Sequence, residues 1–545
     1  MGLLANPLVL FAQDNQGEIQ EEEVIIRKGK KIKLPPVNRN YKKIKIGQPA
    51  AFEQNLDLKF RTANIVLAPL DPSIRIKTIK PEPLAKLYPV LVKAGIGNYA
   101  TTNFELYWDN KRDKNSGIGF FIDHLASQRG PGEEPEISGE SHNKVGVFGE
   151  YAFANSLGVA KLGFQRDHIN YYGIIDDLLF DPNRILPSDN TYNRAYVIAG
   201  IKSYDLASYW DYDFGFKYHF TDDLLGNSEH LIRSVFDLNY ELNPRLKIGL
   251  DLGLDFSQYN QNFFSSSSIN YSRSIIEGLP YVSMEEEKYR FKVGLRVAYE
   301  NDTMLNNNVH IYPVGLFTYH VLPEKLDVYA GVDGRPEIHS FHQASIDNQW
   351  LYNSYLSTSN LVLNLFGGVK GKLGSNLWYD LNLKYKTIDQ LPMFVNVSGG
   401  DRFEVLYENG NSTLFQLEGL ITWQIHRKLS VDFEGRLNNY SMAKQAKAWH
   451  LPGTELNVKA NYFAREKLMF KLGFLILDGI YGRGFSGDEI KLDPIYDLGL
   501  GIEYFFSKRF TIFGDFNNLI GKNYQRYLNY HVKGFNFIAG ASYSF

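Results

Sequence analysis

Residues 245–258, RLKIGLDLGLDFSQ, alternate strictly between two kinds of side chain. Apolar residues occupy the even positions from 246 to 256, and charged or small residues occupy the odd positions from 247 to 257. Successive side chains of a β-strand point to opposite faces, so this pattern predicts an extended strand with one apolar and one polar face. Comparable segments recur at 376–386, 428–440, 496–506 and 534–545. Either a protein core or lipid must cover these apolar faces.

The connections between such segments are of two kinds. Short connections, many of them charged, lie near residues 113, 156, 206, 244, 286, 323, 374, 427, 465 and 508. They alternate with longer polar stretches such as 127–143, 175–193, 339–355 and 478–493. Short turns at one rim and long loops at the other are typical of transmembrane β-barrels. Ten short turns separate eleven hairpins, so we expect about 22 antiparallel strands. The weakly patterned segments around 264–284 and 389–410 leave this number open by two to four strands.

Strand length and hydropathy indicate that the apolar faces of the strands contact lipid. The clearest segments, 376–386 and 428–440, are longer than the roughly 5–6 residues common in globular strands and suit the roughly 9–11 needed to cross a bilayer. No run of 18 apolar residues exists, which excludes a transmembrane helix. A closed barrel leaves no unpaired strand edge in lipid. Aromatic pairs near the strand ends predict an interfacial girdle: Tyr171–Tyr172, Tyr209–Trp210, Phe263–Phe264 and Phe505–Phe506.

Composition excludes several other classes of protein. The chain has no cysteine, which rules out a disulfide framework and a thiolate metal site. Its formal net charge of −3 gives no electrostatic basis for binding nucleic acid.

The N-terminal region differs from the rest of the chain. Residues 1–12 contain an apolar stretch that is read either as a signal-peptide remnant or as an ordinary apolar N-terminus. Residues 13–87 are rich in proline and carry nine basic residues from Arg27 to Lys45. We expect an extended periplasmic arm here, whose basic run is either a solvated tail or a segment that docks into a lumen or onto a partner. Residues 88–545 are expected to form the barrel.

The last 37 residues, 509–545, resemble the end of a TonB-dependent receptor barrel. The motifs that carry this resemblance are Asn517–Asn518–Leu519, the loop residue Tyr524 and the terminal Tyr543–Ser544–Phe545. The resemblance implies 22 strands, and it implies that Tyr543 and Phe545 belong to the signal read by the outer-membrane assembly machinery. The tyrosine-rich composition is similar to that of outer-membrane proteins of the Bacteroidota.

The N-terminal region departs from this family. Residues 13–87 are fewer than the plug domain of such receptors requires, and they do not show the pattern of a folded plug. The stretch EEEVIIRKG at 21–29 is similar to a TonB box, a short motif of low specificity. The resemblance therefore implies a receptor-like barrel without a recognisable plug domain.

Polar residues on the inner face of the predicted strands are the candidate functional residues. They are Lys247, Asp251, Asp255, Asp380, Lys384, Lys386, Asp432, Glu434 and Arg436. Charges of both signs either line a water-filled passage or form cross-strand ion pairs that stiffen the wall. Such mixed charges predict no particular ion selectivity.

A search for catalytic motifs returned none in a suitable context. The best metal-like group, Glu337, His339 and His342, has a spacing that fixes no coordination geometry, so we interpret these three as exposed loop residues. We therefore predict no catalytic residue, no metal site and no cofactor, and a barrel enzyme is the least favoured function.

Two functions remain for a barrel in the bacterial outer membrane with a periplasmic N-terminus. The first is a plugless channel or transporter that moves solutes through a lumen gated by the arm or the loops. The second is a scaffold or accessory subunit of an outer-membrane assembly, secretion or surface-lipoprotein complex. The expected partners are outer-membrane lipid, the assembly machinery and, for the second function, other envelope proteins.

Overall fold

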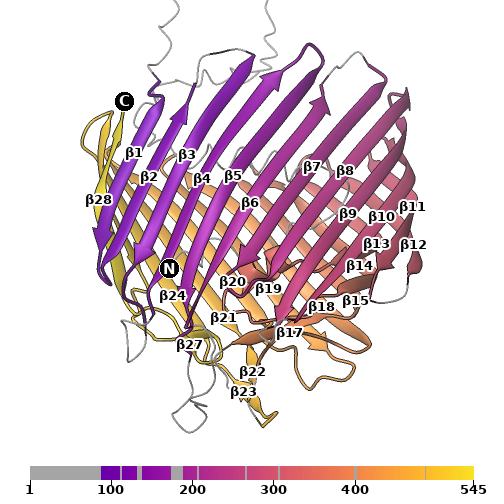
Figure 1. Ribbon diagram of the computed structural model, residues 1–545. Helices are drawn as coiled ribbons and strands as arrows, with labels where there is room; N and C mark the ends of the chain where they lie inside the picture. Colours follow the sequence, from indigo (N-terminus) through magenta and orange to yellow (C-terminus); the bar gives the residue numbers. More distant parts are fainter. Residues whose placement is uncertain are drawn as a thin grey trace, which may run out of the picture.

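The computed structural model describes residues 87–545 except 111–112, 114, 132–137, 174–187, 205–207, 264–266, 305–306, 398–401 and 485. Twenty-two strands form one antiparallel sheet. The first strand, β1 (Val90–Gly97), pairs with the last, β28 (Asn536–Ser544), and this pairing closes the sheet into a barrel (Figure 1). The predicted fold class, a single large antiparallel barrel of about 22 strands, is confirmed.

Each remaining barrel strand pairs with the strands before and after it around the wall. These strands are β2 (Thr101–Asp109), β3 (Ser116–Ser127), β4 (Glu140–Ala152), β5 (Ser156–Asn170), β6 (Asp189–Ser203), β7 (Trp210–Asp223), β8 (Ser228–Asn243), β9 (Leu246–Phe263), β10 (Ser267–Glu285), β11 (Tyr289–Asp302), β12 (Asn308–Leu322), β13 (Leu326–Ile338), β14 (Thr358–Leu373), β15 (Leu377–Asp389), β18 (Asn411–His426), β19 (Leu429–Ser441), β20 (Thr454–Ala464), β21 (Leu468–Asp478), β24 (Ile495–Phe505) and β25 (Phe510–Asn517).

The two rims differ as predicted. All ten short connections expected from the sequence join barrel strands at one rim, which we call the turn rim. The opposite loop rim carries a helix, α2 (Phe341–Asp347), and three hairpins: β16 (Pro392–Asn396) with β17 (Phe403–Tyr407), β22 (Tyr481–Arg483) with β23 (Glu489–Lys491), and β26 (Gln525–Tyr527) with β27 (Tyr530–His531). The hairpins gather at the lower end of the barrel in Figure 1. Among the described residues, no helix is long and apolar enough to cross a membrane.

The weakly patterned regions have two different structures. Around 264–284 the chain forms the longest strands, β9 with 18 residues and β10 with 19. Around 389–410 it forms the small hairpin β16–β17, which is outside the barrel sheet. The alternation weakens in both places because neither segment has one face on lipid and the other on the lumen along its whole length.

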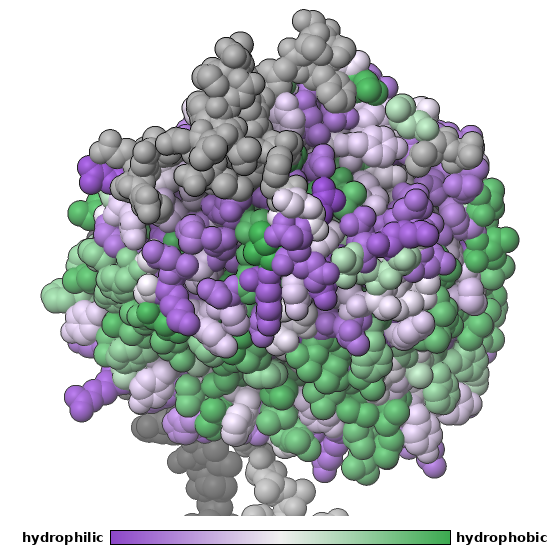
Figure 2. Space-filling view, turned by 90° about the horizontal axis from the view of Figure 1, so that it is seen from below, coloured by the Kyte–Doolittle hydropathy of each residue, from purple (hydrophilic) through white to green (hydrophobic). Residues whose placement is uncertain are grey.

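The barrel exterior is apolar. On β9, Ile248 and Leu252 are exposed, whereas Asp251 and Asp255 lie on the opposite face and are half-buried. Exposed valine, leucine, isoleucine and phenylalanine side chains recur on strands around the whole wall. In the view onto the loop rim, hydrophobic residues occupy the sides of the barrel and hydrophilic residues its middle (Figure 2). An apolar surface of this extent is suited to lipid.

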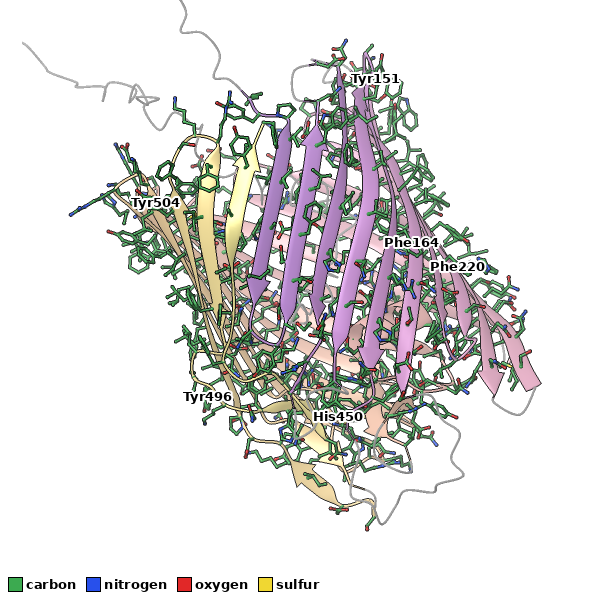
Figure 3. All side chains as sticks on the ribbon, turned by 60° about the vertical axis from the view of Figure 1, so that its left-hand side comes forward. Tyr151, Phe164, Phe220, His450, Tyr496 and Tyr504 are labelled. Carbon is green, nitrogen blue, oxygen red and sulfur yellow. The ribbon has the colours of Figure 1, made fainter. Side chains whose placement is uncertain are left out.

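Exposed aromatic residues form the expected girdle on the turn side, with two corrections. Tyr209 and Trp210 are 66% and 52% exposed, and Tyr151 and Tyr504 lie towards the turn rim in Figure 3. Tyr171, by contrast, is buried in the loop region, and Phe505 is buried as well. Neighbouring residues of an extended chain point to opposite sides, so one member of such a pair faces away from lipid. The side chains of Phe263 and Phe264 lie outside the described residues.

Glycines in the wall make room for aromatic rings on the next strand. Gly249 lies directly opposite Tyr281 in the pairing of β9 with β10, and a Cβ at Gly249 would collide with the Tyr281 ring. The same arrangement joins Gly163 on β5 with Tyr196 on β6. The Tyr281 hydroxyl reaches beyond the glycine to donate to Asn239 Oδ1 at 2.5 Å. Small and large side chains thus interlock across neighbouring strands.

Candidate functional site: a loop cap across the barrel mouth

The connection between β13 and β14, residues 339–357, folds into the mouth of the barrel, and we call it the strap. Its helix α2 begins after Ser340, whose Oγ accepts a hydrogen bond from the Gln343 N–H at 3.1 Å. The Asn348 N–H ends the helix by donating to the Ala344 carbonyl. A serine N-cap is a common helix start. These local signals explain a helix of seven residues in an otherwise β-sheet protein.

The strap extends along one arc of the mouth. It leaves the wall at β13, yet Ser345 Oγ accepts a hydrogen bond from Arg194 Nη2 of β6 at 2.9 Å. Strands β7 to β12 separate β6 from β13 along the wall, and the strap bonds β10, β8 and β7 on the way. In the other direction, the Tyr527 hydroxyl of the β26–β27 hairpin donates to the Asp347 carbonyl at 2.7 Å. The strap therefore joins three sides of the barrel.

Polar side chains of the wall hold the strap backbone. The Tyr192 hydroxyl donates to the Gln349 carbonyl and the Tyr171 hydroxyl to the Leu351 carbonyl, both at 2.9 Å. The Tyr271 hydroxyl accepts from the Leu356 N–H at 2.9 Å. These bonds satisfy backbone groups that would otherwise be buried without a partner.

An aromatic core forms behind the strap. Trp350 stacks on Tyr530 with their ring centroids 4.0 Å apart, and Phe403 and Tyr527 pack edge to face. The Arg402 guanidinium lies over the Tyr171 ring at 4.1 Å. The buried members of this core come from four separate connections and the adjoining strand ends, and they are Ile169, Tyr171, Tyr192, Tyr259, Tyr271, Phe341, Ala344, Trp350, Leu351, Leu356, Phe403, Tyr527 and Tyr530. The strap, the β16–β17 hairpin and the β26–β27 hairpin share this core, and a second cluster with Ile480, Leu492 and Leu528 joins the β22–β23 hairpin to the same cap.

The terminal motif contributes to the same cap. The Asn518 side-chain amide donates to the carbonyls of Lys522 and Lys533 at 2.8 and 3.0 Å. The Tyr524 hydroxyl donates to Asp497 Oδ2 at 2.6 Å. At the other end of β28, Phe545 is exposed and its N–H donates to the Val90 carbonyl at 3.0 Å. The role of Tyr543 and Phe545 as an assembly signal stays a prediction.

The candidate residues on β9 each have a charged neighbour across the strands. The pairs are Lys247 with Glu241, Asp251 with Lys292 and Asp255 with Arg233, at nitrogen–oxygen distances of 3.9, 3.2 and 3.8 Å. Two of the pairs join β9 to its neighbour β8, and the Asp251–Lys292 pair joins β9 to β11, with β10 between them.

The remaining candidates lie on β15 and β19, on a separate part of the wall. Arg436 is bonded to Glu434, and its Nε lies 3.1 Å from Glu418 Oε1; Lys384 Nζ lies 2.9 Å from Glu418 Oε2. Asp380 accepts a hydrogen bond from the Tyr329 hydroxyl at 2.6 Å. In register, Asp432 is opposite Lys459 and Lys386 is opposite Asn364. The structure therefore places the nine candidates in two wall networks and does not gather them into one site.

The interpretation of Glu337, His339 and His342 as exposed loop residues is corrected. Glu337 lies in β13 and is half-buried, and the two histidines lie in the strap. Both histidines are packed against the wall, His342 through a 2.9 Å hydrogen bond between its Nδ1 and Thr221 Oγ1. The His339 Nε2 bonds Ser359 Oγ at 2.6 Å. In the described part of the chain, no three histidine, cysteine, aspartate or glutamate side chains are grouped so that they could hold a metal ion.

Burial shifts the pKa of several cap residues. It lowers the pKa of His339 and of His450, in the connection before β20, to about 4. It lowers the pKa of His342 as well, to which the neighbouring His219 and Arg194 contribute. Burial raises the pKa of Asp347 to about 7. The closed cap thus favours neutral forms of all four side chains.

Acidification is expected to loosen the cap. A histidine whose pKa is about 4 in the closed cap and about 6.5 in water stabilises the closed form above pH 6.5, and this contribution is lost as the pH falls towards 4. Asp347 acts in the opposite direction, because its stabilisation of the closed form is lost as the pH rises from about 4 to 7. Three histidines act against one aspartate, so the closed form loses net stability as the pH falls.

Acrylamide quenching of tryptophan fluorescence measures whether acid loosens the cap, because Trp350 and Trp449 are buried in the loop region. Quenching should increase between pH 7 and 4.5, and His450→Gln should reduce the increase. Equal quenching across this range would contradict the expectation.

The strap was the element that sequence reasoning missed. Residues 339–355 were recognised as a long polar connection, and only the apolar and aromatic content of this loop, in Phe341, Trp350, Leu351 and Leu356, signals that it is buried. The sequence of this loop does not indicate which strands of the barrel it contacts.

A closed barrel of this strand number with an apolar exterior has the size of the largest outer-membrane barrels. Neither a protein-family model nor a curated protein matches the sequence. Solved structures do match the fold. The FrpB iron transporter from Neisseria meningitidis superposes with a TM-score of 0.65 over 85% of this chain and 82% of that chain, at 10% sequence identity.

Two further receptors are similar. Fiu, a ferric-catecholate import receptor from E. coli K12, has a TM-score of 0.62 and 10% identity over 84% of this chain and 82% of its own. FpvA from P. aeruginosa, solved with bound pyoverdines, has a TM-score of 0.63 and 11% identity over 85% of this chain and 72% of its own. At these identities the similarity establishes the barrel fold, which confirms the predicted resemblance to TonB-dependent receptor barrels. The arm, the similarity to a TonB box and the question of a plug fall within residues 1–86, outside the described residues.

Proposed function

We propose that the protein is an outer-membrane transport barrel whose lumen is closed at the loop rim by the cap. The observation that carries this proposal is the folded cap, in which the strap extends along the wall from β13 to β6 and the β16–β17 and β26–β27 hairpins pack against it. A folded obstruction within a wide, polar-walled lumen is what a gated passage requires. The similar receptor barrels, two of which are described as an import receptor and a transporter, support the same class of function.

The proposed orientation follows the general asymmetry of such barrels. Short turns face the periplasm and long loops face outward in outer-membrane barrels. The turn rim and the residues before Val90 are then periplasmic, and the cap faces the exterior. On this proposal the polar residues of the two wall networks line the passage beneath the cap, outer-membrane lipid contacts the exterior, and the assembly machinery reads Tyr543 and Phe545.

One observation favours the alternative function, a scaffold or accessory subunit of an envelope complex. The cap has a buried aromatic core and many hydrogen bonds to the wall, which is also what a static barrel would have. A static cap would present a fixed loop surface to a partner, such as a secretion or surface-lipoprotein component.

Recording from the purified full-length chain in planar bilayers separates the two. The transport proposal expects large, transient openings. The scaffold alternative expects a silent barrel that copurifies in fixed stoichiometry with other envelope proteins in a detergent pull-down, and this pair of results would overturn the transport proposal.

A further inference from the structure

A buried ion pair lies where the strap meets the wall. Arg273 on β10 and Glu229 on β8 are 1% and 0% exposed, and Arg273 Nη2 lies 3.8 Å from Glu229 Oε1. Ser257, on the strand between them, joins the pair: its Oγ donates to Glu229 Oε1 at 2.6 Å and accepts from Arg273 Nη2 at 3.2 Å. The three residues form one polar unit on the wall.

This unit binds the strap at three backbone positions. Arg273 Nη1 donates to the carbonyls of His339 and Ser357, both at 2.9 Å. Glu229 Oε2 accepts from the His342 N–H at 2.8 Å. His339 and Ser357 are also joined to each other by a backbone hydrogen bond of 3.2 Å. One guanidinium therefore holds both ends of the strap, and one carboxylate holds the start of its helix.

The energetics of this ion pair suit a strap that is either bound to the wall or released from it. Burying an ion pair costs desolvation free energy, and a hydrophobic replacement of similar volume is often as stable or more stable. A charged unit is thus a poor means of sealing a mouth permanently. It does define one closed geometry, since any displacement of the strap removes charge-assisted hydrogen bonds and returns both charges to water.

We propose that the strap, residues 339–357, is the moving part of the cap, and that Glu229 and Arg273 form the latch that holds it closed. On release, the strap leaves both Arg273 and Glu229 and stays attached to the wall through β13 and β14, while the three hairpins stay folded. This inference rests on the proposed transport function only for its consequence, which is that release of the strap opens the lumen.

Thiol labelling measures strap release without relying on transport. The chain has no cysteine, so Ala344→Cys introduces a single thiol in α2, at a position that is buried in the cap core. We expect Arg273→Met and Glu229→Gln each to raise the labelling rate of this thiol by roughly 100-fold, because each leaves a buried charge without its partner. The matched control is Arg245→Met, which removes an exposed ion pair with Glu286 (3.0 Å) at the turn rim and should leave the rate unchanged.

A second measurement covers the case in which a latch variant does not fold. Thr221→Cys with His342→Cys places two thiols where the native side chains are 2.9 Å apart. A short bis-methanethiosulfonate, which forms a disulfide with each thiol and releases methanesulfinate, ties the strap to β7. The tie should abolish channel openings, and reductive cleavage should restore them.

The outcomes separate the two proposals. Increased labelling together with a silent bilayer recording would support the latch and count against transport. Unchanged labelling in both latch variants, or openings that persist in the tied barrel, would overturn the latch while leaving transport through the barrel intact.

Discussion

Deleting residues 341–355 and joining the strap ends with two glycines is expected to convert the closed barrel into a constitutively open pore. A linker of two glycines can join the ends because they are already adjacent, with the His339 N–H donating to the Ser357 carbonyl at 3.2 Å. The deletion removes the described segment that extends from β13 to β6 in this 22-strand barrel, together with four members of the cap core, Phe341, Ala344, Trp350 and Leu351. Mean conductance in planar bilayers should rise by roughly tenfold or more.

Tyr355→Ala is the matched control for this deletion. Tyr355 lies in the strap but is exposed, so its truncation leaves the strap in place. Its conductance should equal that of the unmodified chain. A strap deletion that is as silent as this control would show that some other part of the chain closes the lumen.

Gly249→Ala is expected to destabilise the barrel wall by about 1–3 kcal/mol. A Cβ at this position meets the Tyr281 ring, so the ring must move and its hydroxyl loses its hydrogen bond to Asn239. Denaturant titration of the folded barrel, followed by its gel mobility without heating, measures the loss as a lower midpoint.

Gly473→Ala controls for the change of residue type. Gly473 is also in a barrel strand, β21, but a Cβ there has nothing within 4 Å. Its free energy of unfolding should match that of the unmodified chain within the roughly 0.5 kcal/mol typical of such sites, so its midpoint should not shift. Equal midpoints for the two glycine variants would show that the interlocking with Tyr281 contributes nothing.

The wall was predictable because its signals are local. Alternation at 245–258 places Leu252 and Asp251 on opposite faces whatever the rest of the chain does, and the structure shows Leu252 exposed and Asp251 half-buried. The ten short turns likewise need only a few residues each. These two signals together are enough for the strand number.

The cap was not predictable in the same way, because its contacts join distant parts of the chain. Tyr171 and Leu351 are 180 residues apart, as are Tyr527 and Asp347. An aromatic pair at a strand end has the same local pattern in a girdle and in a loop core, so the pattern at Tyr171 predicts the lipid interface although the residue is buried. For His339 and His342, position in a loop does not by itself reveal burial.

The sequence by itself therefore determined a closed membrane barrel with an apolar exterior, a polar inner face and two unlike rims, because period-2 patterning and turn spacing act over a few residues. Only the tertiary structure decided that the mouth is closed. The pairing of consecutive strands sets Glu229, Ser257 and Arg273 side by side on β8, β9 and β10, and the curvature of the barrel turns the connection from β13 towards them. That second meeting depends on the whole barrel, which no local pattern encodes.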